Sequence, residues 1–553
     1  MSKIRIIPLG GVRENGKNIY CIEINNEIFV LDCGLKYPEN ELLGIDTVIP
    51  DFSYLQNNIN HVAGIFLTHG HADAIGALPY LISKYNNIPV FGSKLTISLA
   101  RLHVFNNIKS KKFNNFHVIN EKSILNFKNT KISFFKTTHS IPGSLGIVLN
   151  TDKGEIVYTG DFKFDQSAMS LYKTNFNRLS DIGKGNVLAL LSDSSNSESP
   201  YEHTSEHDIC SYIEEMFQFH DGRIIVASSS SNILRIQQIV NAAYRTNRKI
   251  LLMGRNLEKV IKTTIKLGYL KLPNDIFISE SDLNKLKPCE TVILEAGKIG
   301  EPIKELQKMA TNKHHLITIQ PGDLVFLATT PTYAMETTIA KTKDMIYRAD
   351  ANVKSISDDL HAADHANKND LQLMINLLKP KYLIPIQGEY RSLNAHAKIA
   401  NEVGIPCSNI IMTKIGDVIE YDHKKLHLSN HVISGNVMID GIGVGDIGNI
   451  VLRDRKLLSE DGIFIAVVTI NKKRNKIISS PKLMSCGFIY MKENRNLISE
   501  SKKLIIQTIQ KCFDNKQYDW NELKKSLRDN LNNYLYNKTH QHPIILPIIM
   551  EVR

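Results

Sequence analysis

The chain has 553 residues, of which 42% are hydrophobic and 22% are charged, and its formal net charge is +11. This length allows roughly three or four domains with large cores. The longest apolar runs fall well short of the roughly 20 residues that cross a membrane, and the N-terminal segment is not built like a signal peptide, so we expect no membrane association.

The first 200 residues read as short strands separated by turns and helices. Strands are predicted from hydrophobic patterning, and a helix is predicted at 75–85. Several of the later strands end near a polar side chain that could bind a metal. The pattern indicates a β-sandwich whose strand ends carry a site. The predicted strands are 3–8, 19–24, 27–32, 62–67, 131–136, 145–149, 155–160 and 187–192.

The pattern of predicted strands and helices changes at about residue 205, and the earlier pattern returns at about residue 352. Strands at 223–228 and 249–254 alternate with helices at 232–246 and 256–268, which is typical of a parallel α/β domain. A helix at 369–380, and a strand that runs into a turn within 382–390, then return to the earlier style, so we expect an insertion. After a glycine-rich stretch, strands at 462–470 and 487–491 and a helix at 500–513 predict a separate C-terminal α/β domain.

The segment "LTHGHADAIGA" (67–77) carries the most specific chemical signal. His69 and His71 alternate after a strand, so both imidazoles can reach one ion at about 2.0–2.1 Å. Surface or capping histidines are the alternative. His139 in "TTHSIPGS" and Asp161 in "YTGDFKFD" also follow predicted strands, and Asp161 is well placed to bridge two ions. Together these residues favour a metal centre.

These segments, with "LSDSSNSESP", "SNILRIQQIV", "LLKPKYLIPIQGEYR" and "GVGDIGNIVLRDRKLLSEDGI", are spread over nearly the whole chain. The sequence resembles the metallo-β-lactamase superfamily, within it the β-CASP ribonucleases, and most of all the catalytically degraded second paralogue of bacterial ribonuclease J. The resemblance implies an α/β fold: a metallo-β-lactamase αββα sandwich with an inserted β-CASP α/β domain and a C-terminal α/β domain. The expected parts are metallo-β-lactamase residues 1–205 and 355–435, a β-CASP domain at 206–354, a linker at 436–448 and an oligomerisation domain at 449–553.

The resemblance also implies a ligand set, and two of its members are missing. One family metal site corresponds to His69, His71, His139 and Asp161, which are all present. The second corresponds to Asp73, Ala74, Asp161 and Gln387. A methyl group cannot ligate, and a glutamine carbonyl is a poor ligand for zinc. We therefore expect one tightly bound Zn²⁺ (or Mn²⁺ or Mg²⁺) rather than two, with Asp73 and His365 as catalytic residues.

The family's Ser-Gly-His-Gly loop, which binds the 5′-phosphate, becomes Ala363, Asp364, His365 and Ala366. Asp364 places a carboxylate where an anion should sit, unless it faces solvent or pairs with a lysine. Leu234 replaces a residue that is often polar in active members. Further RNA contacts, for each of which a helix cap or a surface charge is the alternative, are predicted at Ser230, Asn232, Arg235 and Arg255.

The resemblance implies an RNA-processing and mRNA-decay protein, also suited to rRNA processing. It would be a 5′-to-3′ exonuclease, with endonuclease activity left open, that is weak alone and acts with a catalytic paralogue. A non-catalytic RNA-binding scaffold is the alternative, and a hydrolase of small thioesters is a weaker third option. The expected partners are single-stranded RNA with 5′-monophosphate ends and a paralogue in a dimer or tetramer. The odd number of scattered cysteines (seven) favours a cytoplasmic location.

Overall fold

The computed structural model describes residues 3–38, 42–107, 113–254, 257–298, 300–329, 335–441, 443–445, 447–471, 474–515 and 519–552. The chain forms two compact units. Unit 1 comprises Met1–Tyr37 and Thr47–Val437, and unit 2 comprises Pro38–Asp46 and Met438–Arg553. No helix in the described part of the chain is both long enough and apolar enough to span a membrane.

Two mixed sheets form the centre of unit 1. The strand order of the first sheet is β21 (Lys425–His431), β20 (Asp417–Asp422), β1 (Ile4–Gly10), β2 (Ile19–Ile24), β3 (Glu27–Leu31), β5 (Val62–Phe66), β6 (Val90–Gly92) and β7 (Phe116–Val118). The strand order of the second is β19 (Tyr382–Ile386), β12 (Val187–Asp193), β11 (Gly154–Tyr158), β10 (Leu145–Thr151), β9 (Lys131–Lys136) and β8 (Ile124–Asn126).

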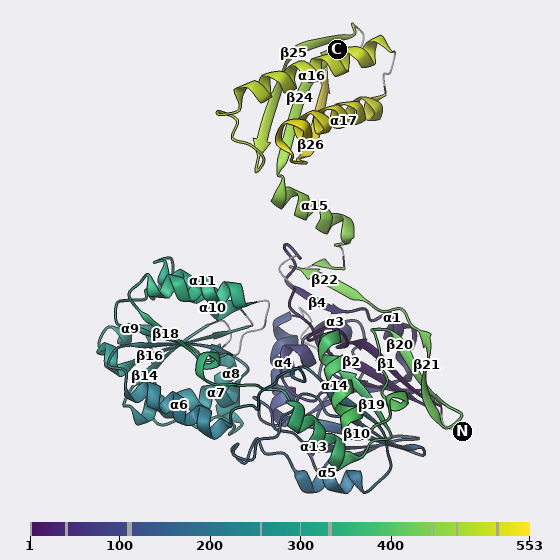
Figure 1. Cartoon of the computed structure of the whole chain (residues 1–553), viewed down its shortest axis with the longest axis vertical. Helices are drawn as coiled ribbons and strands as arrows, with labels where there is room; N and C mark the ends of the chain where they lie inside the picture. The colour runs from purple at the N-terminus through teal and green to yellow at the C-terminus, as the bar shows by residue number, and fades with distance from the viewer. Residues whose placement is uncertain are drawn as a thin grey trace. The chain divides into compact units, whose positions relative to one another are not determined.

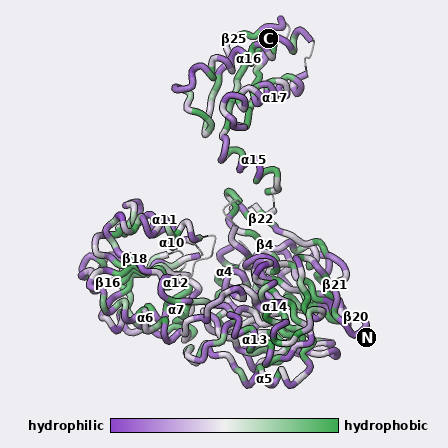
Figure 2. The backbone as a smooth tube through the Cα atoms, viewed as in Figure 1, coloured by the Kyte–Doolittle hydropathy of each residue, from purple (hydrophilic) through white to green (hydrophobic). Residues whose placement is uncertain are grey.

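The two sheets pack face to face because each presents a row of large apolar side chains to the other. Phe29 and Phe66 of the first sheet share one buried cluster with Ile147 and Leu191 of the second. Figure 2 shows hydrophobic residues concentrated on these central strands. Removing such side chains from water stabilises the layered core by about 25 cal/mol per Å² of apolar surface.

Helices cover the outer faces of both sheets and complete an αββα sandwich (Figure 1). On the second sheet they bury a separate apolar cluster around Val148 and Leu190. The helices there are α5 (Phe176–Gly183), α13 (Lys368–Leu378) and α14 (Tyr390–Glu402), and α3 (Leu78–Ile82) and α4 (Lys94–Asn107) lie on the first. The short elements are α1 (Ser53–Asn57), α2 (Ala72–Ile75), α12 (Ile356–Asp359) and β4 (Thr47–Pro50).

The helix predicted at 75–85 is in fact split between α2 and α3. Pro79 lies in the first turn of α3, where its missing N–H costs no hydrogen bond, and a helix running through it would lose one. Gly76 caps α2, and a Cβ there would lie 2.3 Å from Leu35 Cγ. In the break, the Ala77 N–H donates to the carbonyl oxygen of Cys33 at 2.9 Å.

A third, fully parallel sheet is built from the segment between β12 and β19. Its strand order is β15 (Phe277–Ile278), β14 (Lys249–Met253), β16 (Thr291–Gly297), β13 (Ile224–Ser229), β17 (Leu324–Leu327) and β18 (Asn352–Ser355). Its helices are α6 (Glu206–Gln218), α7 (Ile233–Arg245), α8 (Leu257–Lys266), α9 (Glu280–Leu283), α10 (Glu301–Ala310) and α11 (Glu336–Tyr347).

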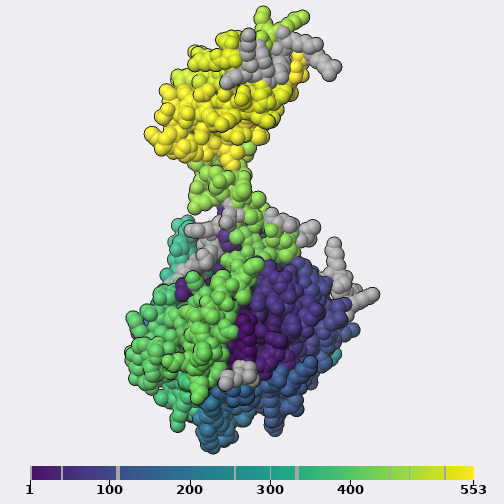
Figure 3. Space-filling model, turned by 90° about the vertical axis from the view of Figure 1, so that its right-hand side faces the viewer, coloured from purple at the N-terminus to yellow at the C-terminus, as the bar shows by residue number. Residues whose placement is uncertain are grey.

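The chain then re-enters the sandwich. Strand β19 pairs in parallel with β12, and β20 pairs with β1. In Figure 3 the N-terminal segment (purple) and the returning segment (green) lie side by side on one surface of unit 1. The parallel sheet is therefore an insertion between two adjacent strands, as the sequence predicts.

In unit 2, a small sheet is covered on one face by two long helices. The sheet order is β25 (Lys476–Cys486), β24 (Ile463–Asn471) and β26 (Ile544–Glu551), and the helices are α16 (Arg495–Asp514) and α17 (Trp520–Thr539). Before them come β22 (Asn436–Asp440), β23 (Gly443–Val444) and α15 (Asn449–Glu460). The predicted linker thus contains two short strands. The strand predicted at 487–491 is wrong: β25 ends before Gly487, whose φ of 74° turns the chain.

Candidate metal centre

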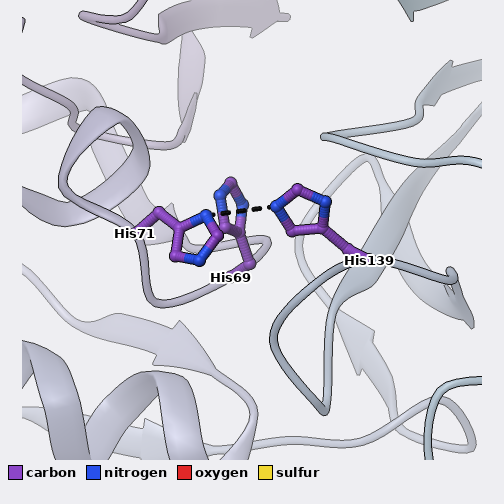
Figure 4. Close-up of side chains that lie close together, drawn as sticks. All are labelled: His69, His71 and His139. Atoms are coloured by element: carbon purple, nitrogen blue, oxygen red, sulfur yellow. Dashed lines mark hydrogen bonds between the residues drawn. The ribbon is translucent and has the colours of Figure 1, made fainter. Parts of the chain in front are cut away.

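Three histidines converge where β5 and β9 end. His69 and His71 lie in the loop after β5, and His139 follows β9. Figure 4 shows their rings gathered around one point. His71 Nδ1 lies 3.1 Å from His139 Nε2, and the ring centroids are 4.8–4.9 Å apart. His69 and His139 are almost completely buried.

The outer nitrogen of each ring faces an oxygen that can accept its proton. His69 Nδ1 lies 2.9 Å from Thr68 Oγ1. His71 Nε2 lies 3.4 Å from the carbonyl oxygen of Ser231, and His139 Nδ1 lies 3.0 Å from that of Asp364. Carbonyl oxygens only accept hydrogen bonds, so the network assigns the outer protons to His71 and His139.

The same reasoning fixes the tautomer of His69. Thr68 Oγ1 lies 2.9 Å from Asp32 Oδ2, and a carboxylate only accepts, so the threonine donates to Asp32 and accepts from His69. Asp32 is fully buried and also accepts from the Tyr158 hydroxyl at 2.6 Å. In the neutral state all three histidines therefore turn lone pairs, not protons, toward one point. Such an arrangement needs a cation.

The donor set fits a metal ion. Asp161 Oδ2 lies 3.6 Å from His69 Nε2 and 3.7 Å from His139 Nε2. The ligands of a tetrahedral ion with bonds of about 2.1 Å stand about 3.4 Å apart, which agrees with these separations. His69 Nε2 is buried with no hydrogen-bond partner among the described residues. The histidines and Asp161 could therefore hold a divalent metal.

The electrostatics of the three histidines differ: burial lowers the pKa of His71 to about 4 and that of His139 well below its usual range, whereas nearby carboxylates favour a proton on His69. Burial opposes a charged imidazole, but Asp161 and Asp73 outweigh it and raise the pKa of His69 to about 9. Burial in turn raises the pKa of Asp161 to about 7. The carboxylates that favour a proton on His69 would equally favour a metal cation in its place.

The other half of the centre has a different chemistry. Gln387 follows β19 at a φ of 53°, is 3% exposed, and donates a hydrogen bond from Nε2 to Asp161 Oδ1. Its Oε1 is buried with no hydrogen-bond partner among the described residues. Ala74 lies in α2 and is completely buried. Asp73 remains, with Oδ2 held by the Asn18 amide at 3.1 Å.

His365 lies at the edge of the centre and is held by a carboxylate that sequence reasoning missed. Its Nδ1 is 2.7 Å from Asp193 Oδ2, and it is 32% exposed. Burial opposes a proton on His365, but Asp193 outweighs it and raises the pKa of His365 to about 10. Asp193 ends β12, directly beside β11, which leads to Asp161. Asp193 lies in "LSDSS", at the end of a continuously apolar strand, and this position could have identified it as a site residue from the sequence.

The predicted RNA-binding residues have different fates. Ser230 and Asn232 are half-buried at the start of α7, and Asn232 Nδ2 donates to Asp364 Oδ2 at 3.4 Å. Asp364 thus pairs with an amide rather than a lysine. Ala363 and His365 are half-buried too. Two more of the predicted contacts, Arg235 and Ala366, are only 3% and 1% exposed, and the prediction for Arg255 lies outside the described residues.

Arg235 is buried because its guanidinium pairs with interior side chains. Nη1 donates to Gln238 Oε1 at 2.6 Å and lies 3.9 Å from Glu206 Oε2. Ala366 packs in the apolar cluster beneath the second sheet. Leu234 is also buried, against Ala168 and Tyr172.

The fold and donor set define a metallo-hydrolase of the metallo-β-lactamase type, and comparison with known proteins agrees. Family models match the chain in order: "Metallo-beta-lactamase superfamily" at 12–198, "Ribonuclease J, beta-CASP domain" at 221–346, "Zn-dependent metallo-hydrolase RNA specificity domain" at 355–409 and "Ribonuclease J C-terminal domain" at 450–552.

Curated relatives match over the whole length. "Ribonuclease J 2" of Streptococcus pyogenes is 50% identical over 554 residues, covering 100% of both chains. "Ribonuclease J 2" of Staphylococcus aureus NCTC 8325 is 44% identical, covering 99% of this chain and 98% of the relative. The chain belongs to the ribonuclease J family. A crystal structure of a protein of unknown function from Enterococcus faecalis V583 shares the fold, with a TM-score of 0.54 and 16% identity over 76% of this chain and all of the other.

Proposed function

We propose that this protein is a ribonuclease J-type RNA-processing enzyme, active from 5′ to 3′ on single-stranded RNA, with a low rate when alone. One observation carries the proposal. The three histidines form one candidate metal-binding group, and Asp161 Oδ2 lies 3.6 Å and 3.7 Å from two of them, while the Gln387 amide donates to Asp161 Oδ1, the oxygen that we assign to a second ion.

We infer that the bound ion is a single Zn²⁺. Three imidazole nitrogens and one carboxylate oxygen suit Zn²⁺ better than Mg²⁺, which prefers oxygen ligands. When bound, the ion would supply Lewis acidity at the scissile phosphate. Asp73 and His365 lie around the centre, and His365, which Asp193 holds in its protonated form, is placed to give a proton to the leaving oxygen.

The low rate follows from what stands in the second half of the centre. Ala74 offers only a methyl group, and the Gln387 Nε2 is a donor that cannot ligate a cation. A two-ion clamp on the attacking and leaving oxygens is therefore not formed. Loss of one such electrostatic contact typically costs about 10²- to 10³-fold in rate.

We propose that RNA reaches the centre beside the first turn of α7. Ser230, Asn232 and the loop of Ala363 and Asp364 are half-buried there. The Asp364 carboxylate repels a 5′-phosphate, which further weakens turnover. The net charge of +11 supports binding to the RNA backbone, with an affinity that falls steeply as salt rises.

The same observations support a second candidate function, a non-catalytic RNA-binding scaffold for a catalytic ribonuclease J paralogue. The surface we assign to that paralogue is the uncovered face of the sheet in unit 2. Apolar side chains from all three strands lie on this face together with Lys482, which is opposite Val467, and α16 and α17 cover only the other face. Four of its apolar side chains, Met484, Leu546, Ile548 and Met550, are each between 40% and 60% exposed. An apolar face of this kind marks an interface.

A nuclease assay with metal analysis separates the two functions. The purified chain and its His69→Ala variant are compared on 5′-monophosphorylated single-stranded RNA, and bound metal is measured in both. Slow turnover that disappears in the variant, with about one ion per wild-type chain, supports the enzyme. Equal residual activity in both proteins points to a contaminating nuclease and favours the scaffold.

A further inference from the structure

A buried charge cluster lies between the sandwich and the insertion, away from the ligands themselves. Lys163, two residues after Asp161, is completely buried, and its Nζ donates to Glu206 Oε1 at 2.7 Å. Glu206 is the first residue of α6 and is 4% exposed. Gln238 of α7 donates to the other oxygen of Glu206 at 2.9 Å, and Arg235 approaches that oxygen.

This cluster joins the segments that orient the metal-centre histidines. Lys163 Nζ also donates to the carbonyl oxygen of Ala363 at 2.9 Å, and the next carbonyl along the chain, that of Asp364, accepts from His139. On the other side, Glu206 binds the first turns of α7. The residue that accepts from His71, Ser231, lies two residues before that helix.

Two backbone hydrogen bonds complete the connection. Lys163 N–H donates to the carbonyl oxygen of Thr138 at 3.0 Å, directly before His139. Leu234 N–H, in the first turn of α7, donates to the carbonyl oxygen of Ser140 at 3.1 Å, directly after it. His139 is therefore held on both sides by groups whose positions depend on the Lys163–Glu206 pair.

We propose that the buried Lys163–Glu206 pair is a positioning device that links docking of the insertion to the geometry of the metal centre. The inference rests on the proposed metal site. The insertion supplies the acceptor for His71, and the loop held by Lys163 supplies the acceptor for His139, so both rings keep their orientation only while the pair is intact. Because linkage is reciprocal, a bound ion must in turn stabilise the docked insertion.

Lys163→Met tests this device. Methionine keeps most of the length of the side chain and removes the charge and both hydrogen bonds, while Glu206 keeps Gln238 and Arg235 as partners. Zinc affinity is measured by competition with a chromophoric chelator, with no RNA present. Loss of groups that orient metal ligands typically weakens binding by about 10- to 100-fold, and that is the expected result.

The matched control is Arg223→Met. Arg223 forms a largely buried pair with Asp323 inside the insertion, with Nε 3.1 Å from Oδ1. Its loss weakens the insertion without touching the groups that hold the histidines, so zinc affinity should stay within about twofold. Equal zinc affinity in Lys163→Met and wild type, or an equal loss in both variants, overturns the proposal.

Hydrogen exchange on the wild-type chain gives a test that does not depend on a variant folding. Zinc should slow exchange of the amides of α6 and in the first turns of α7, as well as in the histidine loops. Protection confined to the histidine loops refutes the linkage while leaving the metal site intact. A wild-type chain that binds no zinc overturns the proposed metal site, and this inference with it.

Discussion

Rebuilding the second half of the centre should convert the chain into a faster nuclease. The change is Ala74→His together with Gln387→His, which replaces the methyl group and the amide by imidazoles. Histidine is among the residues that tolerate a positive φ, so the φ of 53° at position 387 is no obstacle. Both substitutions are needed because each supplies only one ligand.

The expected change in stability is small. Removing the Gln387 side chain removes a buried Oε1 that lacks a partner, and such a group costs about 1–3 kcal/mol. An imidazole at the completely buried position 74 costs about 1–3 kcal/mol of overpacking. Since the two effects oppose each other, the variant should fold. Regaining the second contact should raise turnover by about 10²- to 10³-fold.

The assay is single-turnover cleavage of 5′-monophosphorylated RNA, with bound metal measured in the same samples. The double variant should bind close to two ions and each single variant close to one. Two tightly held ions in the unmodified chain would refute our reasoning about Gln387. Two ions in the variant with no gain in rate would instead make the Asp364 carboxylate the limiting element.

Three further outcomes can be checked on the same chain. Thr68→Val removes the acceptor for His69 and should weaken zinc binding by about 10- to 100-fold, whereas Thr68→Ser, which keeps the hydroxyl, should not; chelator competition measures both. Burial raises the pKa of Glu295 from 4.5 to about 7, so its folded form holds the proton more tightly than the unfolded chain. The free energy of unfolding should therefore fall as pH rises from 4.5 toward 7, by about 3 kcal/mol at most. Urea titrations should show a flatter pH dependence in Glu295→Gln, and an equal decline in the variant and the wild type would contradict the role given to Glu295. Val467→Asp with Ile548→Asp, directly opposite on the uncovered sheet face, should weaken association with a paralogue in sedimentation experiments and leave the thermal midpoint within a few degrees.

The metal ligands were predictable because each follows a strand. His69, His139 and Asp161 come directly after apolar runs, and strand ends of one sandwich gather at one edge. The supporting residues were less visible. Thr68 orients His69 through a hydroxyl, and no spacing rule distinguishes that threonine from a core residue. Asp193 lies in a serine-rich segment that also reads as a turn.

Sequence pattern shows the polarity of a residue but not its neighbours in the fold, and two expectations differ from the structure for this reason. Arg235 reads as a surface charge, yet Glu206, 29 residues earlier, draws it into the interior. The segment 487–491 has the composition of a strand, yet the turn at Gly487 ends the sheet before it. The exact boundaries of the domains remain predictions from the sequence. They are 1–205, 206–354, 355–435 and 449–553.

The re-entry of the chain into its own sandwich constrains how the protein can be made. During synthesis, strand β12 is complete at residue 193, but its parallel neighbour β19 begins only at residue 382. Strand β1 likewise has no partner on one edge until β20 begins at residue 417. A ribosome adding about 5–20 residues per second leaves both strand edges unpaired for roughly ten seconds or more. During that interval the nascent chain exposes a template for misassembly, and slow translation of the insertion prolongs the risk.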